Sequence, residues 1–220
     1  MMNDTEASTE QLMLFCLERG YLKMKLHVDL KERGYDIVLE RGVLNRIAEE
    51  IDVGRRILLV SDSGVPAKWV ELVRAQCPDC VVKIVRPGEE AKSFPVWEEL
   101  LLCMKEHHFV RKDLVIALGG GVVGDLAGFA AACYMRGIDF VNIPTTTLSQ
   151  IDSSIGGKTA INAGGVKNNV GAFWQPRKVL IDLDVLATLP RRHYINGLAE
   201  ALKAGLIYDP QLFALFEQQD

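Results

Sequence analysis

The sequence predicts an α/β protein with a largely parallel sheet flanked by helices, followed by the first helices of an all-α unit. Between residues 24 and 190, strand-like apolar segments alternate with helix-like amphipathic segments, which is the order that produces parallel sheets. After Pro190, two helical patterns follow one another with no strand between them. We therefore expect an α/β domain over 24–190 and the start of a helical domain over 191–220.

Each element follows from a local pattern of apolar residues. An alternating pair, "KLHVDL" and "YDIVLE", opens the series as two strands. Further strands are expected over "RRILLVSD" (55–62), "VVKIVRPG" (81–88), "DLVIALGGG" (113–121), "DFVNIP" (139–144) and "KVLIDL" (178–183). Helices are expected over 42–51, 66–77 (opened by Pro66), 93–108 (capped by Ser93), from about Val123, over 194–208 and over 210–219.

Composition excludes several classes of protein. The chain has 220 residues, 49% of them hydrophobic and 25% charged, which is ordinary for a soluble domain. Its net charge of −4 argues against a nucleic-acid partner, and the apolar run Leu126–Met135 is too short to cross a membrane. Five cysteines, an odd number, fit a reducing cytoplasm better than a set of disulfides. We therefore expect a cytoplasmic protein.

The two ends of the sequence raise separate questions. Residues 1–23 begin with acidic residues, unlike a secretory signal, and include a possible short helix over 10–22. Met24 would serve as a natural start, so we expect 1–23 to be an extension that is not native to the fold. At the other end, the apolar faces of the last two helices could cap the α/β domain or could belong to a larger helical domain. We favour the larger domain.

Three glycines at 119–121 form the first candidate site. Gly119, Gly121 and Gly124 fit the pattern G-x-G-x-x-G between a strand and a helix, where backbone amides and the helix dipole can hold a pyrophosphate. The same glycines could instead serve only a tight turn and close helix packing. Asp125 in the first helical turn and Asp62 after its strand are equally open to a ligand-binding or a purely structural interpretation.

Hydroxyl-rich and lysine-containing segments form the second candidate site. "PGEEAKS" (87–93) follows a strand, and "PTTTLSQIDSSIGGKTAIN" (144–162) combines hydroxyl groups, an aspartate and a lysine. This chemistry suits a polyhydroxylated, phosphorylated ligand. The four histidines share no metal-ligand spacing, and "CPDC" (77–80) has no second ligand pair, so we interpret it as a turn between a helix and a strand.

These segments, together with "GGGVVGDLAGFAAACYMRGI", "KNNVGAFWQP" and "GLAEALKAGLI", closely resemble the 3-dehydroquinate synthase family over residues 24–220. The resemblance implies an NAD-binding domain and a divalent metal, zinc or cobalt, in a cytoplasmic homodimer of the shikimate pathway. It implies conversion of 3-deoxy-D-arabino-heptulosonate 7-phosphate to 3-dehydroquinate with release of phosphate. NAD would oxidise and later reduce the substrate, so that no net redox change remains.

The resemblance also assigns residues. At NAD it places Asp62, Pro87, Gly88, Glu89, Glu90, Ala91, Lys92, Gly120, Gly121, Val122, Val123, Gly124, Asp125, Thr145, Thr146, Lys158, Lys167, Val185, Leu186, Ala187 and Thr188. On the substrate side it places Asp152, Asn168, Lys203 and Arg136, the last reaching a neighbouring subunit's site. Glu200 matches the first metal ligand.

The chain departs from the family in one respect. Family members carry two histidine metal ligands in the helical domain, and none of the four histidines here can stand in for them. Because a catalytic zinc normally takes three protein ligands, we expect the isolated chain to be inactive. Two alternatives stay open: a related NAD-dependent polyol dehydrogenase or sugar-phosphate cyclase, and a non-catalytic NAD-binding module that needs a partner chain.

Overall fold

The structure, a computed structural model, describes residues 23–218. The expected extension over residues 1–23 lies outside this range except for Lys23, as does the expected helix over 10–22. Seven strands form the main sheet: β1 (Lys23–Val28), β2 (Tyr35–Glu40), β3 (Ile57–Asp62), β4 (Cys80–Val85), β5 (Leu114–Gly119), β6 (Asp139–Pro144) and β9 (Lys178–Ile181). Their order is β1-β2-β9-β6-β5-β3-β4, and every neighbouring pair is parallel except β1 with β2. The predicted fold class is confirmed.

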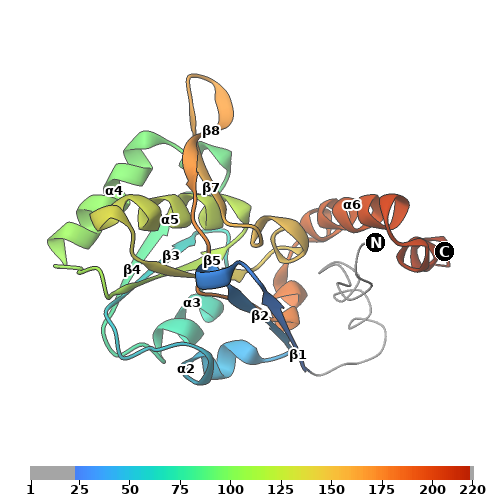
Figure 1. Cartoon of the computed structure of the whole chain (residues 1–220), viewed down its shortest axis with the longest axis horizontal. Coiled ribbons are helices and arrows are strands. Elements are labelled where there is room, and N and C mark those ends of the chain that lie inside the picture. The colour runs from blue at the N-terminus through green and yellow to red at the C-terminus, as the bar shows by residue number, and fades with distance from the viewer. Residues whose placement is uncertain (1–22, 219–220) are drawn as a thin grey trace.

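Helices cover both faces of this sheet (Figure 1). The α-helices are α2 (Ile47–Glu50), α3 (Ala67–Arg74), α4 (Phe94–Glu106), α5 (Gly121–Cys133), α6 (Arg191–Ile207) and α7 (Pro210–Glu217). The short helices are η1 (Lys31–Arg33), η2 (Val43–Arg46), η3 (Glu89–Ala91), η4 (Tyr134–Arg136), η5 (Ser149–Ser153), which is a π-helical turn, and η6 (Leu183–Thr188). None of the helices described between residues 23 and 218 is long and apolar enough to cross a membrane.

The central strands are continuously apolar because both of their faces are buried. In β3, Leu58 and Val60 pack into the core under α4 and α5, whereas Ile57 and Leu59 pack into the core formed with α3 and η2. All four side chains are fully buried. This double burial is the reason why "ILLVSD" lacks the alternation seen in a strand with one wet face.

The helix expected over 42–51 is wrong in its extent. The segment instead forms η2 followed by the four-residue α2. Gly42 adopts φ of +74°, and the buried Asp182 carboxylate accepts hydrogen bonds from the backbone N–H groups of Gly42 and Leu44. These bonds hold the entry to the segment in a turn, and only Ile47–Glu50 adopt an α-helical geometry.

A β-hairpin lies where the sequence suggested ligand-binding segments and no regular structure. Strands β7 (Lys158–Ala163) and β8 (Val166–Phe173) pair antiparallel, and Gly164 and Gly165 turn the chain with φ of +59° and +79°. Two successive positive φ angles are typical of a two-residue hairpin turn. The hairpin packs on α5 so closely that a Cβ at Gly128 would lie 2.5 Å from Thr159 Cγ2, while its far end projects from the molecule (Figure 1).

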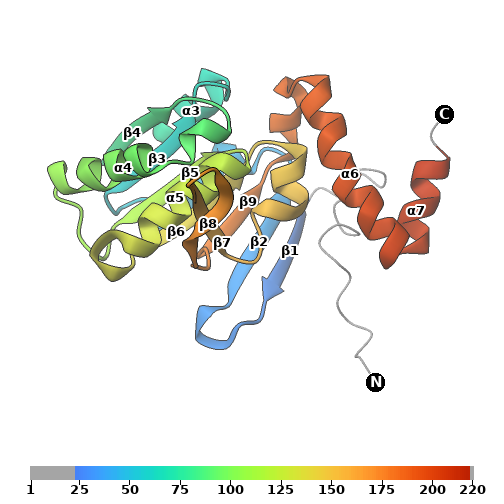
Figure 2. The same ribbon diagram turned by 90° about the horizontal axis from the view of Figure 1, so that it is seen from above.

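Helices α6 and α7 lie side by side and extend away from the sheet (Figure 2). The first half of α6 is anchored by a close backbone contact, because a Cβ on Gly197 would lie 2.4 Å from Leu148 N and 2.7 Å from Thr147 C. Ala201, one turn later, is fully buried in a core cluster with Ile151. The domain boundary near residue 190 stays a prediction.

Replacing Gly197 with alanine tests this anchor. The new methyl group would meet backbone atoms of 147–148 that cannot rotate away, so we expect a loss of about 1–3 kcal/mol in the free energy of unfolding. Urea unfolding followed by circular dichroism measures it. The control is Ile195→Ala, a half-exposed position on the same helix, which should cost less. Equal stability of Gly197→Ala and the unaltered chain would contradict the close contact.

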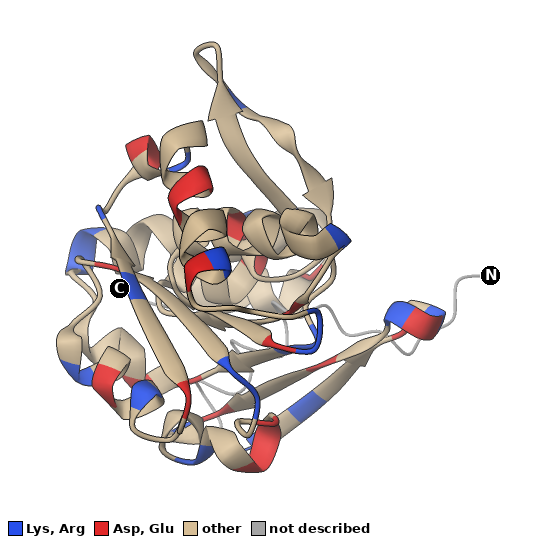
Figure 3. Ribbon diagram, turned by 90° about the vertical axis from the view of Figure 1, so that its left-hand side faces the viewer, with Lys and Arg blue, Asp and Glu red and all other residues tan. Residues whose placement is uncertain are grey.

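Acidic and basic residues are interspersed on the side of the molecule that Figure 3 shows. One cluster joins the starts of three strands: Asp139 on β6 accepts hydrogen bonds from Arg55 Nη1 at 2.9 Å and Arg177 Nε at 2.7 Å. Burial alone would raise the pKa of Asp139, but the two guanidinium groups outweigh it and hold the pKa below its ordinary value of 3.8. The carboxylate therefore stabilises the fold while it is ionised.

This cluster makes stability depend on pH. When pH falls, the unfolded chain takes up a proton at Asp139 before the folded chain does, so the free energy of unfolding decreases as pH falls through the lowered pKa. Asp139→Asn should show a smaller decrease between about pH 6 and about pH 3 than the unaltered chain, measured by urea unfolding. Arg177→Gln should weaken the dependence in the same direction. Identical pH profiles for Asp139→Asn and the unaltered chain would contradict this account.

Candidate functional site

A cleft of about 420 Å³ opens at the carboxyl ends of the parallel strands, where ligands of open α/β sheets bind. The loops after β3, β4, β5, β6 and β9 all reach it, as does the first turn of α6. Ten of the residues that the sequence assigned to NAD line it: Asp62, Pro87, Gly88, Gly120, Gly121, Val122, Thr145, Thr146, Val185 and Thr188. The parallel topology brings these distant segments together, since each follows the carboxyl end of a strand.

The glycines between β5 and α5 have two different roles. A Cβ on Gly119 would lie 2.6 Å from Val123 Cγ2, and one on Gly124 would lie 3.1 Å from Asn142 Nδ2, so these two positions serve close packing. Gly120 and Gly121 instead line the cleft. Gly120 caps α5 without any side-chain hydrogen bond to the first turn. The backbone N–H groups of that turn are therefore available to an anion.

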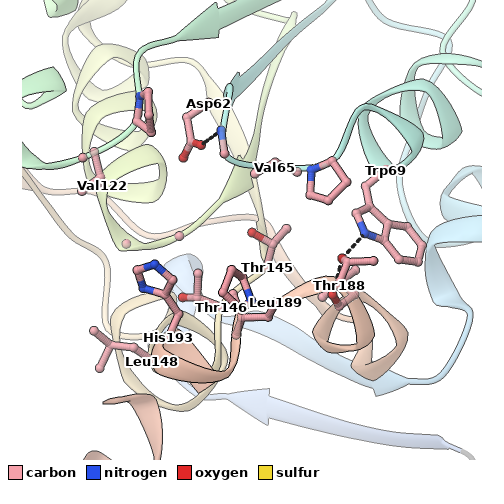
Figure 4. A pocket seen from close by; sticks show the side chains of 18 of the residues that line it. Asp62, Val65, Trp69, Val122, Thr145, Thr146, Leu148, Thr188, Leu189 and His193 are labelled. Carbon is pink, nitrogen blue, oxygen red and sulfur yellow. Dashed lines mark hydrogen bonds between the residues drawn. The ribbon is translucent and has the colours of Figure 1, made fainter. Parts of the chain in front are cut away.

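Hydrogen bonds fix the polar side chains around the cleft (Figure 4). Trp69 Nε1 donates to Thr188 Oγ1 at 2.8 Å, and Thr188 Oγ1 donates to the Val185 carbonyl at 2.9 Å. Asp62 Oδ1 accepts from Gly64 N at 2.7 Å, which orients the carboxylate at the end of β3. The Thr146 hydroxyl lies 2.8 Å from Ser149 Oγ. The cleft is thus preorganised before any ligand enters.

A second polar cluster lies beside the cleft. The buried Lys92 Nζ donates to Asp125 Oδ2 at 2.5 Å and to Asn168 Oδ1. Burial raises the pKa of Asp125, and the charges of Glu89 and Asp152 add to this rise, while the hydrogen bond from Lys92 opposes it. Asp125 and Asn168 line a separate cavity of about 360 Å³ together with Lys158.

The remaining assigned residues lie apart from the cleft lining. Ala91 and Val123 are buried in the core, Leu186 packs at its edge, and Glu90 and Ala187 are exposed. Lys167 is exposed and lies 4.0 Å from Glu89. Asp152 is exposed on η5. Arg136 lies beyond the far end of α5, a helix of 13 residues. The length of this helix, about 20 Å along its axis, separates Arg136 from the glycine turn.

Glu200 and Lys203 pair with each other on α6. Within residues 23–218, no three His, Cys, Asp or Glu side chains come together in a way that could hold a metal ion. The described residues therefore do not fit a metal centre by themselves. Cys77, in the "CPDC" turn before β4, is buried, and its thiol donates to the Val73 carbonyl at 3.3 Å.

Sequence reasoning missed several residues of the cleft. Trp69, Leu148, His193 and Asn196 also line it, and in Figure 4 Leu148 and His193 lie across the cleft from Trp69. Trp69 could have been found, because its helix directly follows the strand that ends at Asp62. His193 offered no such signal, since its place depends on how α6 packs against residues 147–148.

Comparison with known proteins supports one family. Residues 82–196 match the family model described as 3-dehydroquinate synthase N-terminal. The 3-dehydroquinate synthase of Alkaliphilus metalliredigens is 44% identical over 191 residues, covering 86% of this chain and 54% of the relative. That of Caulobacter vibrioides is 48% identical over 198 residues, covering 86% of this chain and 53% of the relative.

Solved structures agree with this result. A 2-deoxy-scyllo-inosose synthase, complexed with carbaglucose-6-phosphate, NAD+ and Co2+, is 28% identical, with a TM-score of 0.79 over 84% of this chain and 52% of its own. The 2-epi-5-epi-valiolone synthase of Streptomyces hygroscopicus, with NAD+ and Zn2+ bound, is 35% identical, with a TM-score of 0.77 over 86% of this chain and 54% of its own. The chain spans about half the length of these relatives. Because the family model matches more than half of its residues, the chain belongs to the 3-dehydroquinate synthase family.

Proposed function

We propose that this chain is the NAD-binding portion of a 3-dehydroquinate synthase, which converts 3-deoxy-D-arabino-heptulosonate 7-phosphate to 3-dehydroquinate and phosphate. The observation that carries the proposal is the cleft at the uncapped start of α5, in a chain of this family. Two structural relatives hold NAD+ and a divalent metal, Co2+ or Zn2+. We extend the same pair of cofactors to the complete enzyme.

The chemistry of the cleft residues suits NAD. The backbone amides of Gly121 and Val122 at the start of α5 would hold the pyrophosphate. No side chain caps this helix end, and the positive end of the helix dipole attracts an anion. The Asp62 carboxylate would accept hydrogen bonds from the adenosine ribose hydroxyls. Thr145 and Thr146 would flank the cofactor from the end of β6. When bound, NAD supplies a hydride acceptor and then the same hydride back, with no net redox change.

A metal ion would need more ligands than the described residues provide. Glu200 would supply one ligand, and a catalytic zinc normally takes three from the protein. We propose that turnover needs ligands in addition to Glu200, and that residues 24–190 act as the cofactor-binding domain beside a helical catalytic domain that begins at 191. Arg136, remote from the cleft of its own chain, would serve a neighbouring subunit in a homodimer. The compartment would be the cytoplasm.

Two other functions are compatible with the fold. An NAD-dependent polyol dehydrogenase has a related architecture, as the structure described as "a probable glycerol dehydrogenase" from Sinorhizobium meliloti, with a TM-score of 0.60, illustrates. At 20% identity that likeness concerns the fold alone. The third candidate is a non-catalytic NAD-binding module that works with a partner chain. The relatives at 44% and 48% identity favour the synthase.

Adding one methyl group at Gly120 tests the NAD site. Its Cβ would lie 3.1 Å from Thr146 Cγ2, between the glycine turn and the threonine. We expect Gly120→Ala to weaken NAD binding by about tenfold or more, because the methyl occupies the space where the pyrophosphate approaches the backbone. Isothermal titration calorimetry with NAD measures it, and quenching of Trp69 fluorescence in the cleft provides a second readout.

The matched control is Gly54→Ala. Gly54 lies outside the cleft and its Cβ would have only the Asp52 side chain nearby, at 3.2 Å. This variant should bind NAD like the unaltered chain. If Gly120→Ala binds NAD equally well while its fold is intact, the pyrophosphate does not lie at this turn.

The reaction itself can be assayed directly. The 220-residue chain, supplied with substrate, NAD and zinc, should release no phosphate at an enzymatic rate, because Glu200 falls short of the three protein ligands that a catalytic zinc normally takes. Release at such a rate would show that other residues complete the site. Accumulation of NADH with a simple polyol would instead favour the dehydrogenase, since a synthase leaves no net NADH.

A further inference from the structure

Lys92 is buried inside the protein and is not exposed in the cleft. Its side chain is only 4% exposed and does not line the 420 Å³ cleft. The ammonium group instead bonds Asp125 on α5 and Asn168 on β8, and lies 3.9 Å from Glu89 Oε1. A buried ammonium group is stable only when such partners surround it.

Residues 89–92 also bind the other strand of the hairpin, β7. Asn162 N on β7 donates to the Lys92 carbonyl at 2.8 Å, and Asn162 Nδ2 donates to Glu89 Oε1 at 2.8 Å. Asn162 Oδ1 in turn accepts from Asn168 N at 2.8 Å. Residues 89–92 therefore bind both strands of the β7–β8 hairpin, through side chains and backbone together.

The outer strand of the hairpin, β8, buries few apolar side chains of its own. Strand β8 is exposed at most positions, and Val166 and Phe173 are 56% and 76% exposed. A segment with few buried apolar contacts has low local stability. Asn168 also adopts φ of +55°, a conformation that asparagine tolerates. Its side-chain oxygen accepts a hydrogen bond from Lys92 and its backbone N–H donates one to Asn162, and these two bonds maintain the conformation.

Lys92 stands between two cavities. Through Asp125 it contacts the first turn of α5, whose start lines the 420 Å³ cleft. Through Asn168 it contacts the 360 Å³ cavity, which Asp125 and Lys158 also line. Any shift of the α5 start relative to the hairpin would break one of these bonds and leave a buried charge without its partner.

We propose that Lys92 is a positioning residue: it fastens the β7–β8 hairpin and Asn168 to the start of α5, and thereby couples the order of the hairpin to occupancy of the cleft. Only the identity of the ligand, NAD, rests on the proposed function. The fastening itself is a property of the folded chain and can be measured without any ligand.

Hydrogen–deuterium exchange of the 220-residue chain tests the proposal. In Lys92→Met, amides of residues 158–173 should exchange at least about tenfold faster than in the unaltered chain, while the sheet strands keep their rates. The matched control is Lys178→Met, which removes another largely buried lysine, bonded to the Glu50 carbonyl and carboxylate at 2.6 and 3.1 Å. Its hairpin should exchange at the unaltered rate.

Adding NAD supplies the second readout. In the unaltered chain NAD should slow exchange in the hairpin, although the hairpin strands are not part of the 420 Å³ cleft. In Lys92→Met the same saturation with NAD should leave hairpin exchange unchanged. Asn168→Ala should resemble Lys92→Met, and the double variant should add little to either, because both changes remove the same link.

Each contrary outcome is distinguishable. If Lys92→Met loses NAD affinity but its hairpin exchanges at the unaltered rate, Lys92 contacts the ligand directly and the positioning role is wrong. If the unaltered chain binds no NAD, the proposed function fails, while hairpin exchange without ligand still decides the fastening. If Lys92→Met does not fold, Asn168→Ala carries the test. Hairpin exchange in that variant at the rate of the unaltered chain would overturn the proposal.

Discussion

Close approach of α5 to its neighbours is the constraint on which the rest of the structure depends. Gly120, Gly124 and Gly128 recur every four residues and so share one side of the helix. An added Cβ at these positions would meet Thr146, Asn142 and Thr159, which belong to the β6 loop, β6 itself and the hairpin. Helix α5 can therefore lie close to β6 on one face of the sheet, and the same side of the helix contacts the hairpin at Gly128. The start of α5 lines both the 420 Å³ cleft, through Gly121 and Val122, and the 360 Å³ cavity, through Asp125.

Such close packing makes a charge on α5 costly. Asp125 is the one charged residue in the helix, and burial raises its pKa. A carboxylate that is mostly buried needs a partner within the protein, because burial removes much of its contact with water. Lys92 provides that partner, and its own burial requires the additional acceptors Asn168 and Glu89. The polar cluster is thus a consequence of the small residues that bring α5 so close to its neighbours.

Local sequence patterns predicted the elements whose apolar residues follow the faces that are buried in the fold. The strand "ILLVSD" was found because both of its faces are apolar, and its end placed Asp62 at the ligand-binding edge of the sheet. The hairpin was missed because its hydroxyl, glycine and asparagine residues carry no alternating apolar pattern. Strand β8 is exposed at most positions, and of its side chains only Val170 and Ala172 pack against the core. His193 and Asn196 were missed because they reach the cleft only through the docking of α6, a long-range contact at Gly197.

The glycine turn shows why sequence alone left its two interpretations open. Gly119 and Gly124 serve close packing, whereas Gly120 and Gly121 line the cleft, where the ligand-binding interpretation stays a prediction. The spacing of a motif does not separate these roles, because each depends on what lies opposite in the fold. Helix α6 likewise serves two places: its first turn lines the cleft, and its next turns carry Glu200 and Lys203. Because one rigid helix bears all of them, any tilt of α6 that reshapes the cleft must also move Glu200.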